Sequence, residues 1–205
     1  MRTGRVQERI PGRVQTQLMW LLVWSLWAVA IPSWAGQLPI NTRLGGEFSL
    51  PSTVGESSSL SDFKGKVVVL NFGYTSCPDI CPMVLNRVAA VMNELEDVRS
   101  QVQPMFITFD PKRDTIERLQ QYLKYFGDDF IGFTGSEEQL AAVARQYGVI
   151  AIAQKSDSAA GTLYTHSDYI YLLDKQGRVR ALFAKSDSVD KMVDDIESLL
   201  EDRCL

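Results

Sequence analysis

The feature that most constrains the fold is an apolar run, Val67 to Tyr74, which leads directly to two cysteines, Cys77 and Cys81. The part from Val67 to Phe72 is rich in β-branched residues and carries no charge on either face. A strand of this kind is buried on both sides, in the middle of a sheet that helices cover. The two thiols therefore lie at a strand-to-helix turn, where the crevice beyond the strand ends is the usual functional site of an α/β fold.

An amphipathic helix is predicted directly after the cysteines. Pro82 suits its first turn, where the N–H that proline lacks has no partner within the helix. Apolar side chains recur at intervals of three and four residues, which is the helical period: Val84, Leu85, Val88, Val91, Met92 and Leu95.

The rest of the chain alternates between strand and helix patterns and ends in a hairpin. In order we expect an edge strand at 47–50, the strand and helix above, a strand at 105–109, a helix capped by Asp114 and Glu117, a helix capped by Ser136 and Gln139, a strand at 149–153, a mobile loop from Gln154 to Thr165, a hairpin of 169–173 with 179–183, and a helix at 189–199. This order predicts an α/β, thioredoxin-like fold, a mixed central β-sheet with helices on both faces, as one domain over residues 36–205.

Residues 1–35 have a different composition from the rest. An unbroken apolar run, 18–30 apart from Ser25, follows four arginines, and Ser33 and Ala35 flank Trp34 in a small-x-small arrangement. This pattern predicts an export signal peptide cleaved after Ala35. The alternative is an uncleaved N-terminal anchor, which requires 31–34 to extend the run toward the roughly 20 residues of a spanning helix. Either way we expect the domain in the periplasm, soluble or anchored to the inner membrane.

Charge and cysteine content limit the function further. The net charge of −4 argues against nucleic acid as a partner, because that contact needs a basic surface. In an oxidising compartment a nearby thiol pair becomes a disulfide unless a reductant or a metal intervenes. Cys204, the third cysteine, follows an acidic helix at the penultimate position, and we expect an exposed thiol without a role there, with an intermolecular bridge as the alternative.

Two aspartates, Asp110 and Asp114, follow the second buried strand and resemble a catalytic carboxylate pair in spacing. A simpler interpretation is structural: Asp114 caps the next helix and one carboxylate pairs with Arg113. We therefore predict no catalytic role for either aspartate.

Four segments together resemble the Sco/SenC family of thioredoxin-fold copper chaperones for cytochrome c oxidase assembly. They are Phe72–Pro82 around the cysteines, Asp110–Thr115, Thr134–Gly135 and the histidine His166. The resemblance spans roughly residues 45–200, and the cysteine motif is its most specific part. It implies a metallochaperone rather than an enzyme, with thiol–disulfide reduction as an auxiliary activity.

The resemblance also implies the ligands and the partners. Cys77, Cys81 and His166 match the family's copper-binding residues, so the chain is expected to bind one copper ion, as Cu(I), Cu(II) or both. The expected recipient is a copper-accepting subunit of a respiratory oxidase, and a thiol reductant protein is a further expected partner. Asp79 and Asp168 are candidates for hydrogen bonds to the ligands, each with a purely structural alternative.

The chemistry of the residues agrees with this expectation. Thiolates are soft ligands that select Cu(I), and imidazole suits copper in either oxidation state. Backbone N–H groups at a helix start favour the thiolate form that a metal requires. His166 is the single histidine of the chain, close to the end of the predicted loop and ahead of the hairpin. Zinc is also compatible with two sulfurs and one nitrogen.

Two other interpretations of Cys77 and Cys81 stay open. A structural disulfide leaves His166 unexplained. A thiol–disulfide oxidoreductase without a metal is the stronger alternative, although the cysteines have three intervening residues rather than the two of thioredoxin motifs. Thioredoxins share a proline beside the active site, and the residues before Tyr169 contain no proline at the corresponding place.

Overall fold

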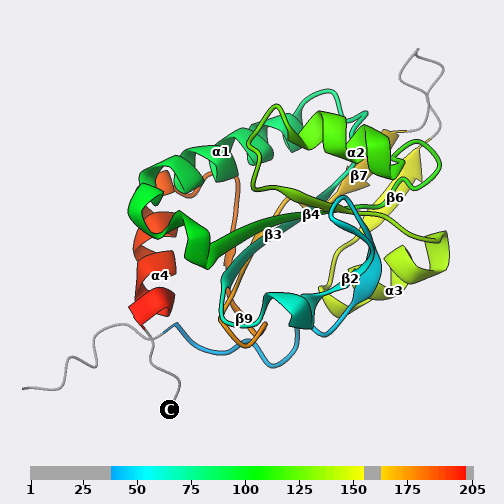
Figure 1. The fold of residues 1–205 in the computed structure, drawn as a ribbon. Helices are drawn as coiled ribbons and strands as arrows, with labels where there is room; N and C mark the ends of the chain where they lie inside the picture. The colour runs from blue at the N-terminus through cyan, green and yellow to red at the C-terminus, as the bar shows by residue number, and fades with distance from the viewer. Residues whose placement is uncertain (1–37, 155–162, 202–205) are drawn as a thin grey trace, which may run out of the picture. The chain divides into compact units, whose positions relative to one another are not determined.

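The computed structural model describes residues 38–154 and 163–201, and within them one large sheet with helices on both faces (Figure 1). The predicted export segment, most of the predicted loop and Cys204 lie outside the described residues. The sheet has seven strands in the order β2-β1-β5-β4-β3-β8-β9. Their bounds are β1 Ser49–Ser52, β2 Gly55–Ser59, β3 Val67–Gly73, β4 Val102–Thr108, β5 Ile131–Phe133, β8 Ile170–Leu173 and β9 Val179–Phe183.

The apolar run forms β3, an interior strand of the sheet, and all seven of its residues are buried, as predicted. It pairs in parallel with β4 and antiparallel with β8. Because β5 continues the parallel pairing and β9 the antiparallel pairing, the sheet is mixed. The predicted thioredoxin-like fold class is confirmed.

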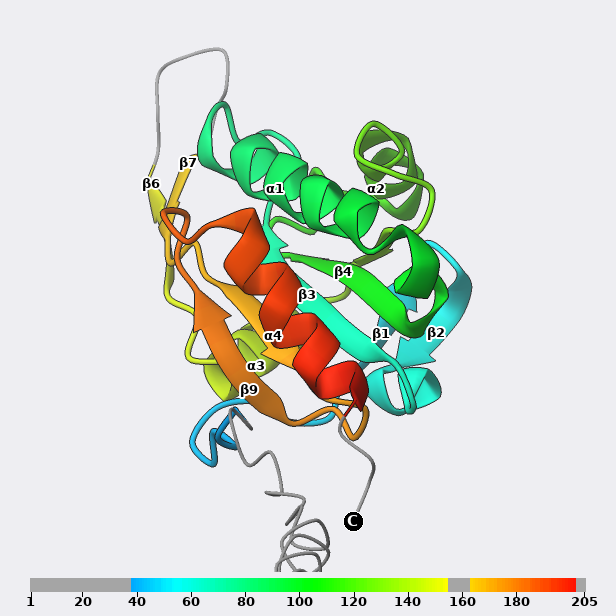
Figure 2. The ribbon, with the colours of Figure 1, turned by 90° about the vertical axis from the view of Figure 1, so that its left-hand side faces the viewer.

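Alternate residues of β3 enter two separate apolar clusters. Val67 and Val69 join the cluster beneath α1, α2 and α4, whereas Val68, Leu70 and Phe72 join the cluster beneath α3. Figure 2 shows α1 and α4 lying across one face of the sheet with α3 behind it. The helices are α1 Ile80–Glu94, α2 Ile116–Leu123, α3 Glu137–Gln146 and α4 Val189–Glu201, with short 3₁₀ helices η1 Leu60–Phe63 and η2 Glu96–Gln101.

Several predicted elements need correction. The strand near 47–50 is Ser49–Ser52, and the serine run after it forms the true edge strand β2. The three-residue strand β5 was not predicted, because so short an apolar run lacks a clear period. The strand β4 begins at Val102, so Pro104 lies inside it and not before it as predicted. The proline is tolerated there because β5 pairs with β4 only from Met105 onward, so the missing N–H of Pro104 breaks no hydrogen bond to β5.

The predicted mobile loop is partly a strand. Ala151–Gln154 (β6) and Leu163–His166 (β7) pair antiparallel as a separate two-stranded arm, with Ala151 opposite His166. The arm places a histidine at a fixed register position, which a loop ending at Thr165 would not do. Among the described residues, no helix has the length and apolar character that crossing a membrane requires.

Candidate metal centre

The strand β3 ends at Gly73, and six residues, 74–79, connect it to α1, which begins at Ile80. Cys77 N–H donates to the carbonyl of Tyr74 at 3.2 Å, so residues 74–77 form a tight turn with Cys77 as its last residue. Cys81 is the second residue of α1, after Asp79 at the N-cap. The turn and the helix start thus place the two sulfurs side by side.

Cys81 is buried, with 1% of its surface exposed, and Gly73 makes room for it. A Cβ atom at position 73 would lie 2.8 Å from the Cys81 sulfur, well inside van der Waals contact. Cys77 is half-buried at the rim. One thiol therefore faces the core and the other is accessible from outside.

His166 reaches the cysteines from the β6–β7 arm. Its Nε2 lies 3.6 Å from the Cys81 sulfur, and its Nδ1 lies 2.9 Å from the carbonyl of Ser167. Because a carbonyl only accepts, Nδ1 carries the proton, and in the neutral ring Nε2 presents its lone pair to the sulfurs. This tautomer is the one that a metal ligand needs.

Aromatic rings hold the histidine in place. The ring centroid of Phe109 lies 4.9 Å from that of His166, and that of Tyr74 lies 6.2 Å away. Tyr164, two residues before the histidine, packs on both rings, and its N–H donates to the Tyr74 hydroxyl at 3.3 Å. These contacts attach the arm to the end of β3 and limit the positions of the imidazole.

The three side chains form one cluster that is able to hold a metal ion. The two sulfurs and one histidine nitrogen lie within 4.8 Å of one another. Cys77 and His166 line a surface cleft of about 460 Å³, together with Asp79 and Asp168. The structure thus brings together residues separated by 85 positions in the sequence.

The electrostatics of the two thiols differ. The Cys81 thiol, together with other donors that include the Cys81 backbone N–H at 3.4 Å, lowers the pKa of Cys77 to about 3. The hydrogen bond to Cys77 and burial raise the pKa of Cys81. Burial lowers the pKa of His166, but hydrogen bonds to Cys77 and to the Ser167 carbonyl outweigh it, so the net pKa is raised. Without a metal, the cluster is therefore one thiolate, one thiol and a histidine that protonates readily.

The other candidate residues lie near the cluster without joining it. Asp79 is exposed and its side chain makes no capping bond, although its N–H faces Cys77. Asp168 pairs with Lys185 at 3.6 Å and raises the pKa of His166. Asp79 thus acts on Cys77 through its backbone, and Asp168 acts on His166 through its charge.

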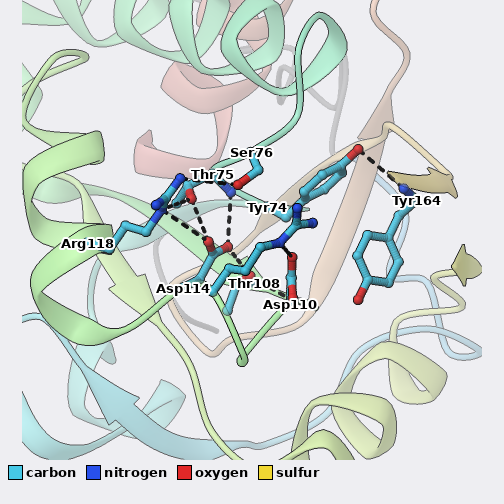
Figure 3. A network of polar contacts seen from close by, with 9 residues as sticks. Tyr74, Thr75, Ser76, Thr108, Asp110, Asp114, Arg118 and Tyr164 are labelled. Atoms are coloured by element: carbon cyan, nitrogen blue, oxygen red, sulfur yellow. Dashed lines mark hydrogen bonds and ion pairs between the residues drawn. The ribbon is translucent and has the colours of Figure 1, made fainter. Parts of the chain in front are cut away.

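The prediction that Asp114 caps α2 is wrong. Thr115 is the N-cap, and its hydroxyl accepts the N–H of Arg118. Asp114 is instead fully buried and accepts hydrogen bonds from Thr75 and Thr108, so its side chain points toward the cysteine turn (Figure 3). The predicted ion pair of Arg113 with Asp110 is present.

Fold and cluster together define a class: a thioredoxin-like domain whose Cys-x₃-Cys turn faces a histidine and forms a metal-binding group. The SCO1/SenC family model matches residues 37–201, and the chain belongs to this family. A SCO2-like protein of Rickettsia felis is 39% identical over 148 residues, which cover 70% of this chain and 72% of the relative.

Solved structures show the same likeness. Arabidopsis thaliana ScoI with copper bound superposes with a TM-score of 0.70 at 34% identity, over 76% of this chain and 97% of the other. Bradyrhizobium japonicum ScoI with copper bound gives a TM-score of 0.71 at 30% identity, over 77% and 99%. Both neighbours were therefore solved as copper complexes.

Proposed function

We propose that this chain is a copper-binding metallochaperone that delivers copper to the binuclear copper site of a cytochrome c oxidase subunit. The observation that carries the proposal is the convergence of Cys77, Cys81 and His166 within 4.8 Å in a chain of the SCO1/SenC family. The copper-bound relatives and the association of the family with cytochrome c oxidase assembly support it. Export to the periplasm, predicted from the pattern of residues 1–35, belongs to the same proposal.

The residues suit copper as a cargo. Cys77 is already a thiolate, Cys81 loses its proton on binding, and His166 supplies a nitrogen from the opposite side. Three ligands leave a position open to a recipient, and half-buried Cys77 is the sulfur that a recipient can approach first. The cleft provides the approach.

Anaerobic copper titration of the reduced domain tests the proposal. We expect one Cu(I) to bind per chain and to displace Zn²⁺ when both metals are present. In His166→Ala the affinity for Cu(I) should fall by about tenfold or more. Absence of copper uptake by a folded, reduced domain contradicts the proposal.

Thiol–disulfide exchange is the second candidate function. The observation that favours it is the asymmetry of the pair, because the half-buried thiolate of Cys77 can attack a disulfide and buried Cys81 can then resolve the mixed disulfide. Reduction of an acceptor's cysteines before metal delivery is compatible with the first function. Efficient reduction of generic disulfide substrates without copper binding favours this second function instead.

A further inference from the structure

A network of polar contacts surrounds the turn that precedes Cys77, and the metal cluster itself does not use it (Figure 3). Thr75 and Ser76 are the two central residues of this turn, and Cys77 is its last residue. The Thr75 and Ser76 hydroxyls both accept hydrogen bonds from Arg118 of α2, and the Thr75 hydroxyl donates to Asp114. Contacts to Thr75 and Ser76 therefore restrict the backbone of the turn that ends at Cys77.

The centre of the network is Asp114, which is fully buried. Its carboxylate accepts the N–H of Thr75 at 2.9 Å and the hydroxyl of Thr75 at 2.5 Å. It also accepts the hydroxyl of Thr108, at the end of β4, at 2.5 Å. A buried carboxylate with three donors holds its neighbours tightly, because loss of any one donor leaves part of a desolvated charge unsatisfied.

Arg118, in the first turn of α2, completes the network from the solvent side. Its Nε donates to the Thr75 hydroxyl at 2.6 Å and its Nη2 donates to the Ser76 hydroxyl at 3.1 Å. The same guanidinium lies 3.8 Å from the Asp114 carboxylate. One planar group thus bridges both central residues of the turn, which a lysine ammonium cannot do with the same geometry.

We propose that Asp114 and Arg118 are positioning residues that clamp the Tyr74–Cys77 turn and thereby set the place of the Cys77 sulfur relative to Cys81 and His166. The two cysteines differ in how the surrounding structure holds them. The core surrounds Cys81 in α1, whereas Cys77 is half-buried and its backbone belongs to the turn. The consequence for copper rests on the proposed function, but the clamp itself does not.

The test compares Cu(I) affinity, by competition with a chromophoric chelator, in variants of α2. Arg118→Gln should weaken Cu(I) binding about tenfold, in the range typical for residues that orient metal ligands. Lys124→Gln removes the same charge from an exposed residue at the end of α2 and should leave the affinity unchanged. Arg118→Lys should recover only part of the loss; complete recovery means that charge alone matters and overturns the clamp.

A double-mutant cycle tests whether Arg118 acts on the turn through the Thr75 hydroxyl. Thr75→Val removes the hydroxyl that links Arg118 to Asp114, so Thr75→Val combined with Arg118→Gln should cost no more than the larger single effect. Additive losses overturn the clamp. Equal free energies of unfolding for the parent and Arg118→Gln exclude a general loss of fold, and Thr75→Val carries the affinity test if Arg118→Gln does not fold.

A readout without metal separates this inference from the proposed function. In the reduced, metal-free domain, Arg118→Gln should speed hydrogen exchange at the amides of Thr75 and Cys77 and leave exchange in β3 unchanged. If the parent binds copper and Arg118→Gln matches it, the clamp is overturned and the metallochaperone function stands. If the parent binds no copper, the amide exchange alone decides, and unchanged exchange overturns the clamp.

Discussion

Gly73 offers the sharpest link between packing and the metal site. In Gly73→Ala the new methyl group would lie 2.8 Å from the Cys81 sulfur and 2.8 Å from the Phe106 ring. Ordinary contacts are about 3.5–4.0 Å, so both neighbours must retreat by about 1 Å. Both are buried, and overpacking of a core costs about 1–3 kcal/mol. We therefore expect a lower free energy of unfolding and a displaced sulfur.

Urea unfolding and copper competition measure the two effects. With a slope of about 2 kcal/mol per M, the unfolding midpoint should fall by about 0.5–1.5 M. A ligand displaced by about 1 Å misses the ±0.2 Å tolerance of metal–ligand distances. Affinity should then fall by about tenfold or more.

Gly55→Ala is the matched control, because a methyl group there meets its nearest neighbour, Ser58, at an ordinary 3.7 Å. It should change stability by no more than about 0.5 kcal/mol. The reasoning is refuted if Gly73→Ala unfolds and binds copper like the parent, or if Gly55→Ala causes equal losses.

Three further predictions concern charge and processing. The Cys81 thiol and nearby N–H groups lower the pKa of Cys77 to about 3, so alkylation of Cys77 should stay fast at pH values well below 9.0, the ordinary pKa of a cysteine, while Cys81 stays unreactive. The contribution of the Cys77 thiolate to stability is fully present above pH 9.0 and is lost as the pH falls toward 3. Asp174→Asn should lower the free energy of unfolding by about 3–5 kcal/mol in chemical denaturation, because it leaves the buried Arg180 guanidinium without its carboxylate. The pKa of Asp174 is lowered because hydrogen bonds outweigh burial, so its contribution is lost as pH falls through that pKa. Cleavage of residues 1–35 should remove all four tryptophans, so the exported protein should show no tryptophan fluorescence; retention of that fluorescence supports an anchor.

The interior strand β3 and the helix after it could be predicted from the sequence because their patterns are local. Val67–Gly73 has no charged residue, and the apolar positions of α1 repeat with the helical period, so neither needs knowledge of the rest of the fold. The three cluster residues followed from chemistry and from the family motif. Their convergence needed only that His166 return to the carboxyl end of β3.

Other parts of the site depend on contacts between distant residues. Thr75 and Arg118 are 43 residues apart, and no spacing rule connects them. Asp114 fitted a helix cap equally well, and only the structure shows its carboxylate turned toward Thr75 and Thr108. The polar composition around 154–165 also concealed β7, whose pairing with β6 is a tertiary feature.

X-ray absorption at the copper edge, on the reduced domain loaded with one Cu(I), tests the central claim most directly. The account predicts two sulfur ligands and one nitrogen ligand in the parent. His166→Ala should lose the nitrogen, and Cys77→Ser should lose one sulfur. A copper ion that retains its nitrogen ligand in His166→Ala, or that takes no sulfur in the parent, contradicts the assignment of Cys77, Cys81 and His166 as the copper site.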